Sequence, residues 1–217
     1  MGRKYRDMVA IFSSIYTIFR LGQVYEDQGI DFDFKILIGI FFMQILVLTY
    51  IYLQNPSNSY KAYLLGPIFL ISWVDSRWRY IYDIDLCFLL IVQLVVGISF
   101  GTVNLIEYFI KYGTDYVLYY GREWINLVLG SCPENLISSL IIFALTLSLS
   151  KIKGAMGGAD PYLYFIITLH MGYYATTVVF FLSYMLAASY LVINYFIYGE
   201  LEERVGLGPF ICMAFIL

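Results

Sequence analysis

The chain has 217 residues, of which 61% are hydrophobic, 19% aromatic and 13% charged, and its formal net charge is −3 at neutral pH. Soluble domains carry about a quarter charged residues and about half apolar ones. The composition therefore predicts an integral membrane protein with the lipid bilayer as its surroundings. The small acidic excess leaves no basic surface of the kind that binds nucleic acid, so we expect no nucleic-acid partner.

Apolar runs between polar breaks predict the helices in chain order, since a spanning helix needs about 20 predominantly apolar residues. Residues 1–34 are expected to form an amphipathic helix at the membrane interface, followed by a short acidic linker with Glu26, Asp27, Asp31 and Asp33. The runs that follow are 35–53, 62–74, 86–100, 136–149, 162–176, 178–198 and 207–217. The last is too short to span and is expected to be a half-helix. The predicted fold class is all-α, a polytopic membrane helix bundle with about six to seven transmembrane helices.

The breaks between these runs suggest one helical membrane domain with an N-terminal appendage. Pro56 and its asparagine neighbours predict a turn at 54–59. Charges scattered among aromatic residues predict that 101–135 lies at the interface, and 199–206 is expected to be a charged loop. We therefore expect residues 1–60 to hold the interfacial helix and an extra transmembrane helix, and 61–217 to form the core.

Basic residues near the spans predict the orientation, because cytoplasmic loops are enriched in Lys and Arg. The residues that favour a cytoplasmic N-terminus are Arg3, Lys4, Arg6, Arg77, Arg79, Lys151, Lys153 and Arg204, whereas Lys61, Lys111 and Arg122 disagree weakly. This orientation puts Asp75 and Asp160 on the cytoplasmic side at similar depth.

Metal and thiol chemistry have little support in the sequence. Cys87, Cys132 and Cys212 are far apart and form no Cys-x-x-Cys motif. His170 is the only histidine, and it is expected in the middle of a helix as a packing residue rather than a ligand. We therefore expect neither a metal site nor a cofactor.

Asp75 and Asp160 are the residues best placed for chemistry, because each lies at the end of an apolar run. Acids at the edge of a membrane helix are costly and are often functional. Two carboxyl groups held close together cannot both ionise cheaply, so they share a proton near neutral pH. One can then act as base on a water molecule and the other as acid. The alternative, that each is a helix-end cap or pairs with a neighbour such as Arg77 or Arg79, remains open at this point.

Three stretches then resemble one family. Trp-Val-Asp-Ser-Arg-Trp-Arg-Tyr-Ile at 73–81 is similar to the Asp-x-Arg-x-Arg-x-Ile-Pro motif of type IV prepilin peptidases, which belong to the GxGD intramembrane aspartyl proteases. Gly-Gly-Ala-Asp at 157–160 resembles their Gly-x-Gly-Asp motif, and Gly-Leu-Gly-Pro-Phe at 206–210 resembles the stretch that opens their final helix. The three occur in the family's order, and the resemblance covers about 62–217.

The resemblance implies a short-form peptidase that removes the leader of prepilin-like proteins at the cytoplasmic face of a bacterial or archaeal membrane. Its dyad would be Asp75 and Asp160. The substrate-binding residues would be Gly157, Gly158, Ala159, Gly208, Pro209 and Phe210. Asp83 and Asp85 lie outside the motif and are expected to be solvated loop acids or helix caps.

Several features depart from the family pattern. Tyr82 stands where the motif has Pro, and Tyr162 stands where a Lys usually follows the second Asp. The N-terminal region with paired cysteines, linked to N-methylation in the large bacterial enzymes, has no counterpart here, so we expect no methyltransferase activity. Arg77 and Arg79 are expected to be topology anchors. The acidic loop with Glu200, Glu202 and Glu203 is expected to be solvated rather than to bind a basic leader.

Three other functions remain as alternatives. A presenilin-like or signal-peptide-peptidase-like protease would carry Tyr-Asp and Pro-Ala-Leu motifs, whereas this chain has Val74-Asp75 and Gly-Pro-Phe. A small transporter would use the two acids for ion coupling, with acids near the midplane and helices broken in repeated halves. A non-catalytic membrane subunit would tolerate the loss of either acid.

Overall fold

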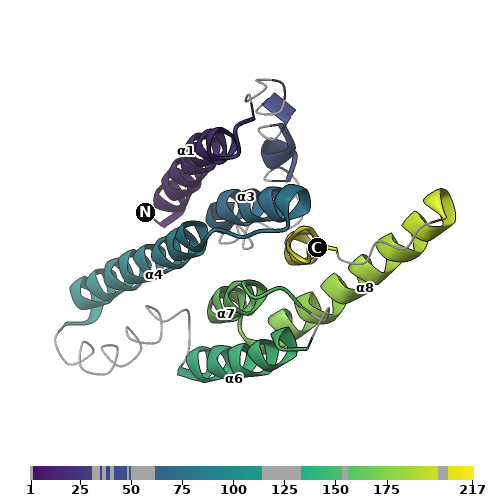
Figure 1. Cartoon of the computed structure of the whole chain (residues 1–217). Helices are drawn as coiled ribbons and strands as arrows, with labels where there is room; N and C mark the ends of the chain where they lie inside the picture. The colour runs from purple at the N-terminus through teal and green to yellow at the C-terminus, as the bar shows by residue number, and fades with distance from the viewer. Residues whose placement is uncertain are drawn as a thin grey trace. The chain divides into compact units, whose positions relative to one another are not determined.

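The computed structural model describes residues 2–30, 35, 38–39, 42–47, 49, 62–113, 133–152, 156–199 and 205–217. All regular secondary structure in these residues is helical, which confirms the predicted all-α class (Figure 1). The helices are α1 (Gly2–Asp27), α3 (Ala62–Trp78), α4 (Asp83–Tyr112), α6 (Pro133–Ser150), α7 (Asp160–Met171), α8 (Tyr173–Tyr198) and α9 (Gly208–Ile216).

Several predicted features lie outside the described residues. The predicted span at 35–53 is described only in part. The others are the acidic linker residues Asp31 and Asp33, the turn at 54–59, Lys61, the segment 114–132 with Arg122 and Cys132, Lys153, and the loop 200–204 with its acids and Arg204.

The chain forms two compact units, Met1–Leu70 with Ile216 and Ile71–Phe215 with Leu217. In the first unit, α1 and the first half of α3 approach closely at Gly66. A Cβ atom there would come within 2.8 Å of Thr17 Oγ1 and 2.9 Å of Ser13 Oγ, so only glycine fits the contact without a shift. The functional division into 1–60 and 61–217 stays a prediction.

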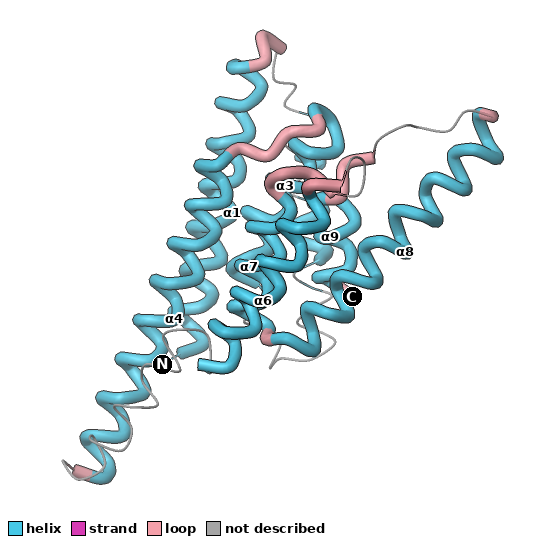
Figure 2. The backbone as a smooth tube through the Cα atoms, turned by 60° about the horizontal axis from the view of Figure 1, so that its bottom comes forward, coloured by secondary structure: helices cyan, strands magenta, loops and turns pink. Residues whose placement is uncertain are grey.

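Helix α7 is the core of the second unit. It packs most extensively against α6 and also against α8 and α4, and Figure 2 shows it beside α6. The side chain of Phe143 on α6 meets the rings of Tyr162 and Phe165, with centroids 5.1 and 5.8 Å away. The hydroxyl groups of Tyr164 and Ser183 join α7 to α8 through a buried 2.6 Å hydrogen bond. This packing holds the N-terminus of α7 in place.

The predicted fifth span at 162–176 is wrong, because α7 ends at Met171 and α8 begins at Tyr173. Gly172 separates the two helices with a φ of 80°, a left-handed conformation that favours glycine. The 12 residues of α7 extend about 18 Å, well short of a hydrocarbon core about 30 Å thick.

The predicted boundary between the run 86–100 and the segment 101–135 is also wrong. Helix α4 continues without a break through 101–112 and ends at Gly113, whose φ is 78°. Gly101 lies inside this helix, where one glycine costs only about 1 kcal/mol relative to alanine. It therefore does not stop a run that continues with residues such as Ile106 and Ile110.

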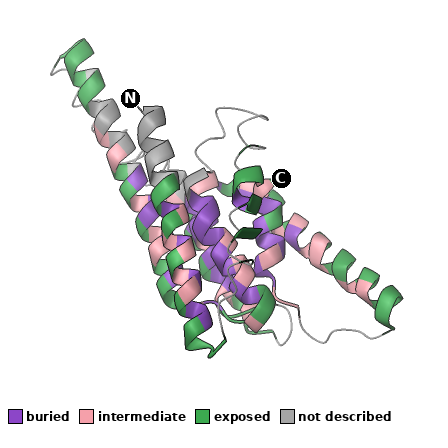
Figure 3. Ribbon diagram, turned by 90° about the horizontal axis from the view of Figure 1, so that it is seen from above, coloured by how far each residue is buried: buried purple, intermediate pink, exposed green. Residues whose placement is uncertain are grey.

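By length and composition, one helix of the described residues can cross a membrane, namely α8 with 26 residues. Only 17% of its most apolar stretch is buried, so most of its apolar side chains face outward. Figure 3 shows exposed residues over its C-terminal half, which includes Phe196 and Tyr198. The described residues do not support the prediction of six to seven spans.

Candidate active site

Asp75 lies near the end of α3, and its carboxyl group is buried with the side chain only 7% exposed. The backbone N–H of Gly208, the first residue of α9, donates a 2.8 Å hydrogen bond to Asp75 Oδ2. The two residues are 133 positions apart in the chain. The bond therefore fixes the start of α9 against the end of α3.

The approach of α9 depends on two glycines. A Cβ atom at Gly206 would overlap Asp75 Oδ2 and lie 2.8 Å from its Cγ, whereas one at Gly208 would lie 2.9 Å from Oδ2. Real Cβ atoms do not approach that closely, so both positions need glycine for space. Neither has a positive φ, so conformational freedom is not the reason.

Asp160 is the first residue of α7 and is only 3% exposed. The backbone N–H of Gly157 donates a 2.8 Å hydrogen bond to Asp160 Oδ2, and a Cβ atom at Gly157 would lie 3.0 Å from the same oxygen. Pro161 follows at the start of the helix, where its missing N–H costs no helical hydrogen bond. The two acids are thus held alike, each by one glycine N–H.

The two carboxyl groups interact through their charges. Burial raises the pKa of Asp160 to about 7, the negative charge of Asp75 adds to this rise, and the Gly157 N–H opposes it. Burial also raises the pKa of Asp75, against the Gly208 N–H and the positive charge of Arg79. Because the repulsion is mutual, the protons belong to the pair. Near neutral pH the pair can hold one proton and one negative charge.

This arrangement predicts that stability falls as pH rises. The pKa of Asp160 lies at about 7 in the folded protein against an ordinary value of 3.8. Between these values the folded protein keeps a proton that the unfolded chain has lost, so the loss of stability occurs in this window and ends above it. Asp160→Asn should therefore raise the free energy of unfolding above neutral pH, by up to about 4 kcal/mol at roughly 1.4 kcal/mol per pKa unit.

Thermal unfolding in detergent at acidic and alkaline pH checks this expectation. The stabilisation should be large at about pH 8 and small at about pH 4, where the folded carboxyl group is neutral and the unfolded one has only begun to ionise. An equal change at both values would show that Asp160 carries no costly buried charge.

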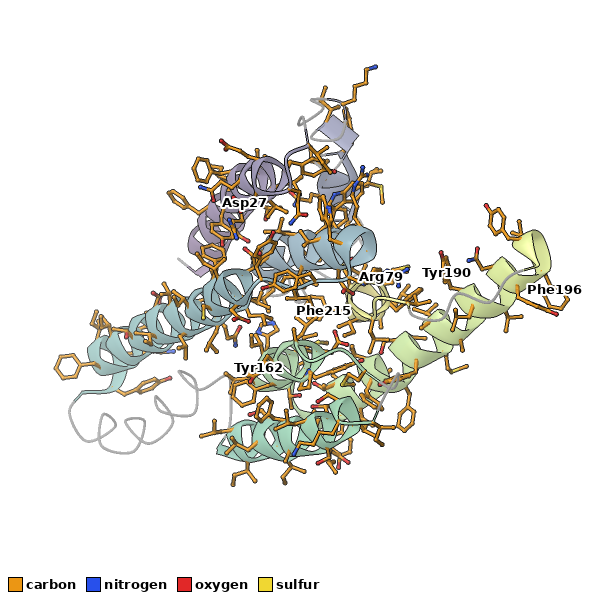
Figure 4. The ribbon with its side chains drawn as sticks, viewed as in Figure 1. Asp27, Arg79, Tyr162, Tyr190, Phe196 and Phe215 are labelled. Carbon is orange, nitrogen blue, oxygen red and sulfur yellow. The ribbon has the colours of Figure 1, made fainter. Side chains whose placement is uncertain are left out.

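The sequence also predicts Gly158, Ala159, Pro209 and Phe210 at the site. Gly158 is exposed, with nothing within 4 Å of an added Cβ atom, and Ala159 stands at the N-cap position of α7 without a side-chain cap. Pro209 lies in the first turn of α9. Phe210 packs against Tyr190 of α8, with ring centroids 5.6 Å apart; Figure 4 labels Tyr190 on α8.

Asp83 and Asp85 occupy the first turn of α4, which is a favourable place for acids at a helix N-terminus. Asp83 is exposed, as expected of a solvated acid. Asp85 is only 1% exposed, so the expectation that it is solvated is wrong. Residues two apart lie on nearly opposite sides of a helix, so Asp83 faces water while Asp85 faces inward. Neither is an N-cap, since Tyr82 holds that position.

Two residues that lie near the acids were not predicted from the sequence as site residues. Gly206 belongs to the third motif, and its neighbour Gly208 was the available signal. Tyr184 of α8 interacts electrostatically with Asp160. No sequence signal could single out Tyr184, because the chain has 22 tyrosines and only tertiary packing brings this one near α7.

In the described part of the chain, no three His, Cys, Asp or Glu side chains gather as a metal centre. The prediction that His170 lies in the middle of a helix is wrong, since it lies in the last turn of α7. The site therefore offers two carboxyl groups and backbone N–H groups. No protein-family model, curated protein or solved structure matches the chain. Inference about function depends on the site itself.

Proposed function

We propose that the protein is a membrane aspartic endopeptidase that cleaves the leader peptide of type IV prepilin-like proteins. The observation that supports this most is the pair of buried carboxyl groups, Asp75 and Asp160, which come from helices far apart in sequence and act on each other. A structural pair of this kind would be costly, because burying two like charges together destabilises the fold. Peptide hydrolysis makes use of that arrangement.

In the proposed reaction, a water molecule lies between the two carboxyl groups. The ionised carboxylate removes a proton from the water, whose oxygen attacks the scissile carbonyl carbon. The protonated carboxyl group donates its proton to the carbonyl oxygen, giving a neutral tetrahedral diol. When the C–N bond breaks, the carboxyl group that took a proton from the water gives it to the leaving amine. The other carboxylate takes back a proton from a hydroxyl group of the diol. No cofactor is required for these steps.

The membrane setting is part of the same proposal. The protein would be multi-pass, with about six to seven transmembrane helices, and its active site would face the cytoplasm at the membrane surface. The exposed Gly157 and Gly158 would let an extended substrate approach closely.

Cleavage by the purified protein in liposomes tests this function. A prepilin-like substrate with a short basic leader before a hydrophobic helix should be cut once, at the end of the leader, and mass spectrometry of both products would identify the bond. If a panel of such substrates stays intact while the liposomes show proton or cation flux, the transporter alternative replaces the peptidase. If neither activity occurs, the non-catalytic subunit remains.

A further inference from the structure

Arg79 has an unusual backbone conformation next to the site. It directly follows the last residue of α3 and has a φ of 56°, and no other non-glycine residue in the described chain has a positive φ. Its N–H donates a 2.9 Å hydrogen bond to the carbonyl oxygen of Asp75. Helices that end in this way usually have glycine at the left-handed position, because a Cβ atom is strained there. Strain that persists in a fold is a reason to look for a function of the side chain.

The left-handed turn places Arg79 one helical turn beyond Asp75. The positive charge of Arg79 acts on the Asp75 carboxyl group, while the guanidinium group remains exposed. Figure 4 labels Arg79 at the end of α3. Arg77 is also exposed and lies two positions after Asp75 on the same helix.

The surroundings of the two acids are therefore unequal. Asp75 has the Gly208 N–H from α9 and the positive charge of Arg79, and both favour its ionised form. Asp160 has the Gly157 N–H, but the charge of Asp75 and deeper burial disfavour its ionised form. The Tyr184 hydroxyl of α8 also interacts electrostatically with Asp160. When the pair loses its first proton, the charge should settle on Asp75.

We propose that Arg79 is a positioning residue that keeps Asp75 ionised, so that Asp75 is the base toward water and Asp160 is the acid toward the scissile carbonyl. This inference rests on the proposed function. The proton of the water passes to Asp75 and then to the leaving amine, and the proton of Asp160 passes to the carbonyl oxygen and returns from the diol. Glycine at this position would relieve the backbone strain but would lack the charge.

Arg79→Gly removes the positive charge and keeps the backbone conformation, because glycine adopts the left-handed conformation without strain. The variant should fold at least as well as the intact protein. Its cleavage rate should fall by about two- to fivefold on the acid limb of the pH–rate profile, as expected for an exposed charge interaction, and much less above neutral pH. The acid limb of the pH–rate profile should move toward neutral pH, because Asp75 takes up its proton more readily. Arg79→Lys should restore the limb, and Arg77→Gln is the matched charge control.

A second readout needs no substrate. Arg79 stabilises the ionised form of Asp75, so its contribution to stability is present at higher pH and lost as pH falls through the pKa of Asp75. The difference in melting temperature between the intact protein and Arg79→Gly should therefore change with pH, and this change should vanish when both carry Asp75→Asn. A melting difference that is independent of pH, or an unmoved acid limb, would overturn the role of Arg79 even if cleavage occurs. Failure of cleavage with the expected melting behaviour would instead count against the proposed function alone.

Discussion

Replacing Asp75 or Asp160 by asparagine is expected to abolish leader cleavage, with a loss of about 10²–10⁴-fold for each acid–base group. Asparagine has nearly the same shape as aspartate, and its side-chain oxygen can still accept the N–H of Gly208 or Gly157. It cannot take up or release a proton at any pH of interest. Both variants should therefore remain folded but inactive, which a cleavage assay in liposomes and thermal unfolding of the same preparations would measure.

Asp83→Asn is the matched control for this experiment. Asp83 is an exposed acid in the first turn of α4, a few residues beyond Asp75 in sequence, and has no place in the proposed reaction. This variant should cleave at the rate of the intact protein. Full cleavage by Asp75→Asn or Asp160→Asn would refute the dyad, and loss of cleavage in all three would point to a general effect of acid removal.

Gly206→Ala is expected to have the next largest effect. The added methyl group would overlap Asp75 Oδ2 and lie 2.9 Å from the Asp75 carbonyl oxygen, so either the carboxyl group or the segment before α9 must move. Overpacking at such a contact costs about 1–3 kcal/mol of stability. Displacement of Asp75 by about 1 Å should also reduce cleavage about 100-fold, because the reacting groups lose their alignment.

Gly158→Ala provides the comparison for Gly206→Ala. Gly158 belongs to the Gly-x-Gly-Asp-like motif, yet an added methyl group there meets nothing within 4 Å. The motif alone would make the two glycines equally sensitive, whereas the structure predicts that Gly158→Ala leaves stability unchanged. Equal losses of melting temperature in the two variants would show that α9 does not approach Asp75 as described. Peptide cleavage by Gly158→Ala measures separately whether substrate needs space at this position.

Several helices could be predicted because their signals are local. Runs of apolar residues with polar or proline boundaries placed α3, α6 and α9 within a few residues of their observed ends. The long apolar run at 178–198 also predicted α8, which is long enough to cross a membrane. These features depend on residues next to one another in the chain, and neighbouring residues suffice to determine them. The same reasoning failed at Gly172 and Gly101, because one glycine ends a helix and the other does not, according to the backbone angles that packing imposes.

The sequence also singled out Asp75, Asp160 and the glycines near them, since acids beside apolar runs are rare and costly. It could not establish which backbone groups meet these acids. The hydrogen bond from Gly208 to Asp75 joins residues 133 positions apart. The proposed effect of Arg79 on Asp75 depends on a left-handed turn that no residue pattern predicts. Likewise, burial of Asp85 and contact at Gly206 depend on which elements lie against them. Local chemistry thus determined the residue types available at the candidate site, whereas distances, burial and the balance of charge between the two acids arise only when distant segments pack together.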